Sequence, residues 1–231
     1  MSIRQRRFCT KSHVAPQSVG VTSIGILGGT GNQGRGLALR LAKAGATVVI
    51  GSRERQRAID TATQIGHGVV GEDLATAACA DVVIVAVPWD AHAATLSALQ
   101  QQLAGKVVID CVNPIGFGEG GPVALAVEEG SACQQAAKLL PDSKVVGAFH
   151  HIAAPLLLDE SVQSMDTDVL VVGDDVASCE QVVEIVNLIP GLRGVRAGKL
   201  ADAGQVEALT VNLIRINRRL KVHAGLRITG L

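Results

Sequence analysis

The chain has 231 residues, of which 48% are hydrophobic, 18% charged and only 2% aromatic. This length and apolar content suit one large domain, or one domain with a small appendage, and exclude a largely disordered chain. The longest apolar runs, such as the one within residues 81–88, have the length of a strand, and none approaches the roughly 18 residues of a membrane span. The scarcity of aromatic residues argues against nucleic-acid modules that stack bases on aromatic rings.

The net charge is zero, but the charges are unevenly distributed along the chain. Residues 1–53 carry eight lysines and arginines, residues 208–231 carry five, and all 21 acidic residues lie between these basic ends. This pattern indicates local anion-binding sites rather than a nucleic-acid coat. The five cysteines form no Cys-x-x-Cys motif, as expected for reduced thiols in a cytoplasmic protein without a metal site. Residues 1–20 lack the apolar segment of a secretory signal, so we expect a disordered basic extension.

Short apolar runs alternate with helical patterns in the first two thirds of the chain. The runs and patterns predict strands at residues 21–27, 46–50, 81–86, 106–110 and 144–148, and helices at residues 32–43 and 53–64. Because alternating strands and helices form βαβ units, residues 21–150 are predicted to form a Rossmann-type parallel sheet with helices on both faces. The glycine-rich residues 113–122 are predicted to form a mobile loop.

The pattern changes after residue 150. Strands are predicted at residues 168–172 and 192–196 and helices at residues 175–187 and 200–220, which together indicate a small C-terminal αβ cap over residues 151–231. The long last helix has an apolar side formed by Leu209, Leu213, Ile216 and Leu220. Packing this side against a second copy of the chain would bury it, so we expect a homodimer.

A phosphate-binding turn is predicted directly after the first strand. Gly29, Thr30, Gly31, Asn32, Gln33 and Gly34 form the pattern Gly-x-Gly-x-x-Gly between a predicted strand and a predicted helix. In this context the first glycine allows the tight turn, the second lets the backbone approach a pyrophosphate, and the third lets helix and strand pack closely. The helix N-terminus supplies free N–H groups for the anion. The motif therefore predicts a dinucleotide site.

The end of the second strand distinguishes between the two nicotinamide dinucleotides. Folds of this type that bind NAD place an acid about 20 residues after the turn, where it holds the ribose 2′-hydroxyl. Here no acid precedes Glu54, and the strand is followed by Ser52 and Arg53, with Arg57 four residues later on the same predicted helix face. A hydroxyl and two guanidinium groups, with Thr30 within reach, suit the dianionic 2′-phosphate. We therefore predict NADP(H) rather than NAD(H).

The rest of the sequence offers no motif for acid–base chemistry. It contains no tyrosine, which excludes the Tyr-x-x-x-Lys arrangement, and it contains no Gly-x-Ser-x-Gly nucleophile turn. A reaction that needs no proton relay fits this composition. Direct hydride transfer between two stacked cofactors is such a reaction, because the protein supplies only their orientation.

Several segments resemble the NADPH-dependent coenzyme F420 reductase family. They are residues 26–45, residues 49–53, the runs Val87-Pro88-Trp89 and Asn113-Pro114, residues 144–152, Val172-Gly173-Asp174-Asp175 and Glu207-Ala208-Leu209-Thr210. The resemblance extends from about residue 22 to the C-terminus. It implies an enzyme that transfers a hydride between NADP(H) and the deazaflavin coenzyme F420, with the two rings stacked at the carboxyl edge of the sheet.

The resemblance also implies positions for the two cofactors. For NADP(H) these are Gly29, Thr30, Gly31, Asn32, Gln33, Ser52, Arg53 and Arg57, with Val87, Pro88 and Trp89 beside the nicotinamide. For F420 they are Asn113, Pro114, His150, Ile152, Thr210 and Leu226, of which His150 and Ile152 would orient the deazaflavin. The sequence departs from the family pattern at His92, His151 and Ala153, which bear on the deazaflavin pocket.

The acid-free C-terminal segment adds a basic rim that suits the phosphate and oligoglutamate tail of F420. The rim consists of Arg215, Arg218, Arg219, Lys221 and Arg227.

Three alternatives remain open from the sequence alone. The first is an NADP(H)-dependent imine or hydroxyacid reductase, although residues 152–231 are short for the helical domain that such enzymes need. The second is the same hydride transfer to a flavin, a quinone or a metal centre. The third is a non-catalytic NADP(H) sensor, which would keep Ser52, Arg53 and Arg57 but lose a second cofactor pocket.

Overall fold

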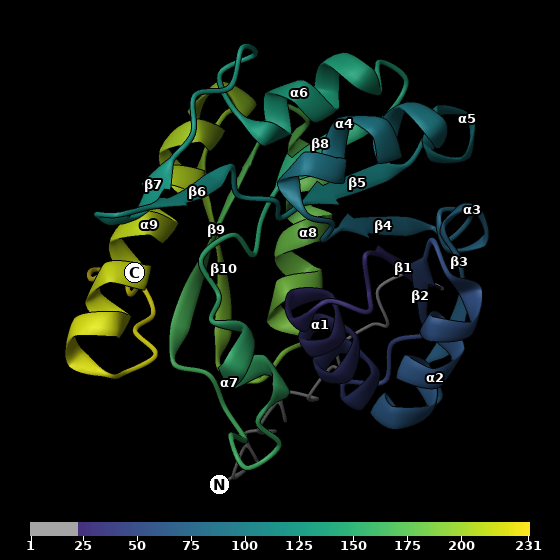
Figure 1. Ribbon diagram of the computed structural model, residues 1–231, viewed down its shortest axis with the longest axis horizontal. Coiled ribbons are helices and arrows are strands. Elements are labelled where there is room, and N and C mark those ends of the chain that lie inside the picture. Colours follow the sequence, from purple (N-terminus) through teal and green to yellow (C-terminus); the bar gives the residue numbers. More distant parts are fainter. Residues whose placement is uncertain (1–22) are drawn as a thin grey trace, which may run out of the picture.

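Eight strands form one sheet in the computed structural model, which describes residues 23–231 (Figure 1). The predicted extension at residues 1–20 lies outside the described residues. The strands are β1 (Ile24–Leu27), β2 (Val48–Ser52), β3 (Val70–Asp73), β4 (Val82–Val85), β5 (Val107–Asp110), β8 (Lys144–Gly147), β9 (Thr167–Gly173) and β10 (Leu192–Gly198). Their order across the sheet is β3-β2-β1-β4-β5-β8-β9-β10. The first six are parallel, β9 runs antiparallel to β8, and β10 is parallel to β9.

Helices cover both faces of the sheet, because the strands are apolar on both sides. In β4, Val82 and Ile84 belong to one buried cluster and Val83 and Val85 to the other. The first cluster packs under α1 (Asn32–Lys43), α2 (Arg55–Ile65), α7 (Ala154–Leu158) and α8 (Val176–Asn187). The second packs under α3 (Leu74–Ala77), α4 (Trp89–Ala98), α5 (Gln100–Leu103), α6 (Ala132–Leu139) and α9 (Ala203–Leu220). This is the predicted Rossmann-type architecture. None of the helices in the described part of the chain has the length and apolar character needed to cross a membrane.

The predicted cap does not form a separate layer. Strands β9 and β10 continue the sheet of the first 150 residues, and the 3-10 turn Leu200–Asp202 leads from them into α9. Beyond α9 the chain returns to β9, where the backbone N–H of Asp168 donates to Leu226 O over 2.7 Å. The pairing changes from parallel to antiparallel between β8 and β9, and the domain boundary at residue 150 stays a prediction.

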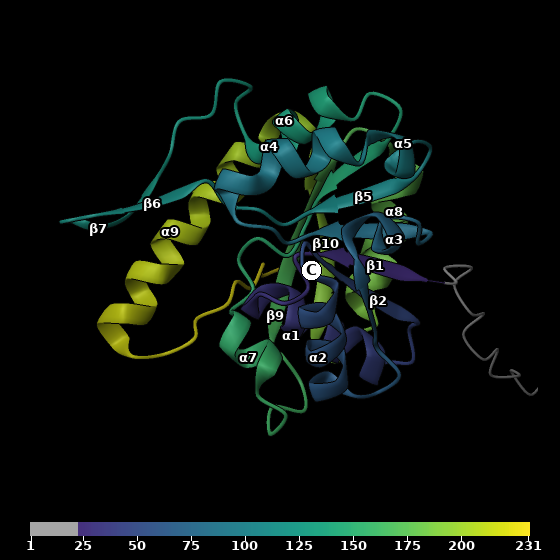
Figure 2. The same ribbon diagram turned by 45° about the vertical axis from the view of Figure 1, so that its right-hand side comes forward.

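A hairpin occupies the segment that was expected to be a loop. Strands β6 (Ile115–Gly118) and β7 (Gly121–Ala124) pair antiparallel and project from the body beside α9 (Figure 2). Arg215 of α9 fixes the hairpin, because its guanidinium donates to Gly120 O over 3.2 Å and to Pro122 O over 2.9 Å. The glycines here allow a tight turn, with Gly121 at a φ of 93°, rather than an open loop.

Candidate functional site

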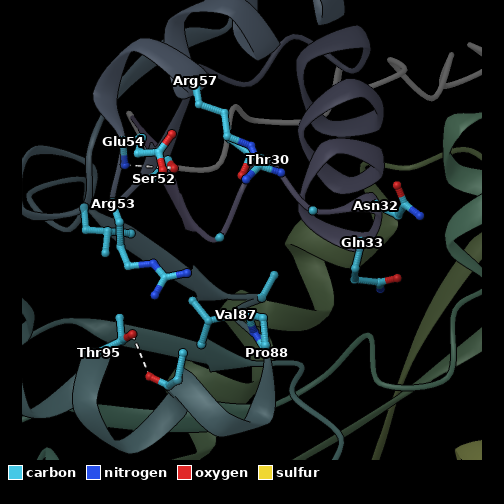
Figure 3. Close-up of a pocket in the computed structure, with 15 residues that line it drawn as sticks. Thr30, Asn32, Gln33, Ser52, Arg53, Glu54, Arg57, Val87, Pro88 and Thr95 are labelled. Carbon is cyan, nitrogen blue, oxygen red and sulfur yellow. Dashed lines mark hydrogen bonds between the residues drawn. The ribbon is translucent and has the colours of Figure 1, made fainter.

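A cavity of about 390 Å³ opens at the carboxyl ends of β1, β2 and β4 (Figure 3). This edge is where ligands bind in open parallel sheets. The predicted residues that line the cavity are Thr30, Gly31, Asn32, Gln33, Ser52, Arg53, Arg57, Val87 and Pro88. Sequence reasoning did not identify Gly28, Glu54, Leu74, Ala86, Ala91 and Thr95, which also line it.

The glycine-rich turn leaves the start of α1 open toward this cavity. The N-cap residue Gly31 makes no side-chain capping bond, and the first turn of α1 contains no acid. A Cβ atom added to Gly34 would lie 2.7 Å from Gly28 O, so only glycine lets the helix approach the strand this closely. At Gly31 the nearest atom to such a Cβ would be Gly28 O at 3.4 Å. The unpaired N–H groups therefore present an anion site with an open approach.

The basic wall of the cavity comes from the segment after β2. Arg53 precedes α2, which begins at Arg55, so Arg53 and Arg57 do not share a helix face as predicted, although both line the cavity. Neither makes an ion pair within residues 23–231, whereas Arg55 is bound by Glu72, with Nε 2.7 Å from Oε2. Two free guanidinium groups thus face the space beside Ser52, which suits a phosphate group.

A second cavity, of about 610 Å³, adjoins the first and shares Gln33 with it. It lies at the carboxyl ends of β5 and β8, under α9. The predicted residues that line it are Gln33, Asn113, His150, Ile152 and Thr210. His151 and Ala153, where the sequence departs from the family pattern, also line it, as do Arg218 and Lys221 of the predicted basic rim. The lining residues without a predicted role in this pocket are Ala154, Pro155, Leu213, Ile214, Asn217, Val222 and His223. The helical spacing of Thr210, Leu213 and Asn217 in α9 could have indicated one common face.

Hydrogen bonds hold the turn that forms the floor of the second cavity. Asn113 Nδ2 donates to His150 O over 2.8 Å, and the Thr210 hydroxyl donates to the same oxygen over 3.2 Å. Asn113 and Thr210 also bond to each other over 3.3 Å. The two predicted residues therefore fix the position of His150 from opposite elements, the loop after β5 and α9.

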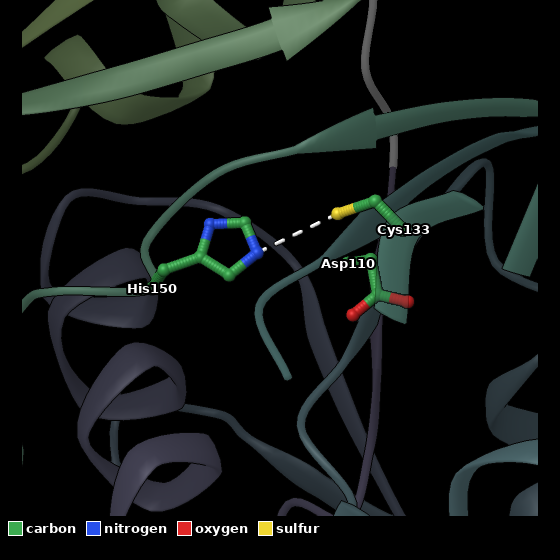
Figure 4. Close-up of side chains that lie close together, drawn as sticks. All are labelled: Asp110, Cys133 and His150. Atoms are coloured by element: carbon green, nitrogen blue, oxygen red, sulfur yellow. Dashed lines mark hydrogen bonds between the residues drawn. The ribbon is translucent and has the colours of Figure 1, made fainter. Parts of the chain in front are cut away.

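A buried polar cluster lies behind His150. Its Nε2 atom is 3.5 Å from Cys133 Sγ, and Asp110 lies beside both (Figure 4). One ligand atom from each of these three buried residues lies within 4.8 Å of the others, a grouping that could hold a metal ion and that sequence spacing did not indicate. Asp110, however, already accepts from His92 Nε2 over 2.7 Å and from Val112 N over 2.9 Å.

The charges in this cluster follow from burial and from Asp110. Burial opposes protonation of His92, but the Asp110 carboxylate outweighs it and raises the pKa of His92. Burial, with Asp110 adding to it, raises the pKa of the Cys133 thiol well above its usual range. Burial also lowers the pKa of His150 to about 4, and that of His151 likewise. At neutral pH both imidazoles are neutral, and their buried Nδ1 atoms have no hydrogen-bond partner in the described residues.

Four predicted positions, Gly29, Trp89, Pro114 and Leu226, line neither cavity. Trp89 packs on the second buried cluster beside His92, with ring centroids 5.5 Å apart. Pro114 is buried at the start of the hairpin, and the backbone of Leu226 bonds to β9. Gly29 lies in the turn itself, where its Cβ would meet Ile50 at 2.5 Å. Of the basic rim, Arg218 and Lys221 line the second cavity.

A family model, two curated relatives and a solved structure carry the same family description. Residues 23–114 match the family described as NADP oxidoreductase coenzyme F420-dependent. The chain is 39% identical to the F420-dependent NADP reductase of Methanothermobacter thermautotrophicus, over 91% of this chain and 96% of that protein. It is 35% identical to the enzyme of the same name from Methanocaldococcus jannaschii, over 90% and 98% of the two chains. A crystal structure from Arthrobacter sp. FB24, provisionally assigned as an F420-dependent NADP reductase, superposes with a TM-score of 0.79 at 27% identity and covers 91% of this chain and all of that one.

Proposed function

The chain belongs to the F420-dependent NADP oxidoreductase family, and we propose that it transfers a hydride directly between NADP(H) and coenzyme F420. The observation that carries this function is the pair of adjoining cavities that share Gln33 at the carboxyl edge of the sheet. Two ligands bound there would meet at the shared residue. A sensor needs only the first cavity, so the second one favours an enzyme.

The first cavity fits the nucleotide. We propose that the open start of α1 binds the pyrophosphate, and that Ser52, Arg53 and Arg57 bind the 2′-phosphate. The apolar wall formed by Val87 and Pro88 faces these groups and would carry the nicotinamide half (Figure 3).

The second cavity fits the deazaflavin. Neutral His150 and His151 keep its floor free of charge, and we propose that His150 and Ile152 orient the ring there. Arg218 and Lys221 at its rim would bind the anionic tail of F420. When both are bound, the two cofactors supply the hydride donor and acceptor, and the chain contributes binding, orientation and the exclusion of water.

The function is tested by mixing the protein with NADPH and oxidised F420 and following the loss of the deazaflavin absorbance. NADH replaces NADPH in one control, and FMN or FAD replaces F420 in another. We expect turnover with NADPH and F420 and little with the substitutes. With NADPH deuterated at the transferred position, the deuterium should appear in reduced F420 and not in water. Turnover with FMN but not with F420 would contradict the choice of acceptor.

We further propose that the enzyme is a homodimer and acts in the cytoplasm. The predicted apolar side of α9 is only partly free, because Leu213 is buried within its own chain, whereas Leu220 is 56% exposed. The hairpin, which projects beside α9 (Figure 2), adds Phe117, which is 67% exposed and whose ring centroid lies 5.4 Å from Arg218 Cζ of α9. An exposed apolar surface of this kind supports self-association. Light scattering should give a dimer mass, and Phe117→Ser with Leu220→Ser should give a monomer. The cytoplasmic location stays a prediction from the scattered cysteines.

A further inference from the structure

Among residues 23–231, Gln33 is the one that lines both cavities. It is the second residue of α1 and the fifth residue of the Gly-x-Gly-x-x-Gly motif that we propose binds the nucleotide. Its Nε2 atom donates a hydrogen bond of 3.1 Å to Phe149 O, two residues after the end of β8. A side chain from the nucleotide-binding turn therefore supports the backbone that precedes His150.

The supported residue has an unusual backbone conformation. Phe149 is fully buried and has a φ of 63°, in the left-handed region that non-glycine residues rarely adopt. Such a conformation persists only where the surroundings hold it. The Phe149 carbonyl accepts from Gln33 and, over 3.4 Å, from the backbone N–H of Ile152. These bonds close the turn of residues 149–152, which places His150, His151 and Ile152 in the second cavity.

The supports of this turn come from both sides of the active centre. Asn113 and Thr210, which hold the His150 carbonyl, line only the second cavity. Gln33 is the support that also lines the nucleotide cavity. The Gln33–Phe149 hydrogen bond thus links the first turn of α1 to the turn that forms the floor of the second cavity.

We propose that Gln33 is a positioning residue that couples the two cofactor sites. A nucleotide in the first cavity fixes the start of α1 and, through Gln33, orders the 149–152 turn for the acceptor. Coupling of binding free energies is reciprocal, so a bound acceptor also tightens nucleotide binding. The identity of the acceptor rests on the proposed function, whereas the ordering of the turn by the nucleotide does not. Gln33 moves neither protons nor electrons.

Hydrogen exchange of the peptide containing residues 149–152 tests the ordering without any acceptor. In the wild type, saturating NADP⁺ should slow this exchange at least about fivefold, the lower end of usual coupling between sites. Gln33→Glu keeps the shape of the side chain but replaces the donor with an oxygen, and Gln33→Leu removes it. Both variants should lose the NADP⁺-dependent slowing. Asn32→Ala is the matched control, because Asn32 lines only the first cavity; it should weaken NADP⁺ binding but keep the slowing at saturation.

A second measurement compares the dissociation constant of F420 with and without saturating NADP⁺. In the wild type, the dissociation constant without NADP⁺ should be at least about five times the constant with NADP⁺. In Gln33→Leu the two constants should be nearly equal. If both Gln33 variants retain the NADP⁺-dependent slowing of exchange, the role of Gln33 is refuted, whatever the acceptor. If the slowing depends on Gln33 but the wild type neither binds nor reduces F420, the coupling stands and the proposed acceptor is wrong.

Discussion

Arg53→Ala tests the assignment of the basic wall to the 2′-phosphate. Arg53 lines the nucleotide cavity and makes no ion pair within residues 23–231, so its removal leaves no unpaired acid behind. A hydrogen bond to a charged group contributes about 1.5–3 kcal/mol. Because Arg53 is exposed, the lower end applies, and about 1.5 kcal/mol corresponds to a roughly tenfold weaker affinity for NADPH. NADH lacks the 2′-phosphate, so its affinity should change little.

The assay measures the dissociation constants of NADPH and NADH by calorimetry at two salt concentrations. Arg55→Ala is the matched control, because Arg55 lies in the same segment but pairs with Glu72 outside the cavity. The NADPH effect of Arg53→Ala should shrink at high salt, since an exposed charge is screened. An equal loss for NADPH and NADH, or an equal loss in Arg55→Ala, would refute the 2′-phosphate assignment.

Three further predictions concern stability. Arg40 is buried and donates to four carbonyls of the α7 segment, those of Leu156, Leu157, Asp159 and Val162, at 2.6–2.8 Å. Arg40→Met should therefore lower the free energy of urea unfolding by about 3 kcal/mol, whereas Lys43→Met, which removes one surface ion pair, should change it by less than about 0.5 kcal/mol. The Arg193 guanidinium, aided by the Ile228 N–H and by Arg227, holds the pKa of buried Asp168 well below its usual range. The ionised Asp168 carboxylate therefore adds to the free energy of unfolding above about pH 4, and this stabilisation is lost as the pH falls further. Asp168→Asn should accordingly destabilise the protein at pH 7, and the difference from wild type should narrow at pH 3; a constant difference would contradict this. Burial depresses the pKa of His151 to about 4, so protonation of the unfolded chain should destabilise the wild type as the pH falls from about 6.5 to 4, and His151→Gln should show a smaller loss over this interval in urea midpoints.

Local patterns predicted the nucleotide half of the protein well. The first helix was predicted at residues 32–43, and α1 spans Asn32–Lys43. The prediction matched because an apolar strand, a glycine-rich turn and a helical pattern follow one another directly in the sequence. The residues of its cavity come from three such local units, the ends of β1, β2 and β4. Strand β3 was missed because Val70–Asp73 contains one apolar residue and two acids, and only its pairing with β2 defines it.

The second cavity could not be predicted from local pattern. Its predicted residues came from a family resemblance, and its other walls come from α7, α9 and the chain that follows α9. The contacts that shape it join residues far apart in sequence, such as Gln33 with Phe149 and Cys133 with His150. The sequence by itself determined the strand–helix alternation and the glycine-rich turn, and it predicted the preference for a 2′-phosphate, because each depends on neighbouring residues. Only the tertiary structure decided that the two cavities adjoin at Gln33, because their walls come from segments far apart in the sequence. The same packing of distant segments buries the unpartnered Nδ1 atom of His150 and holds Phe149 in a left-handed backbone conformation.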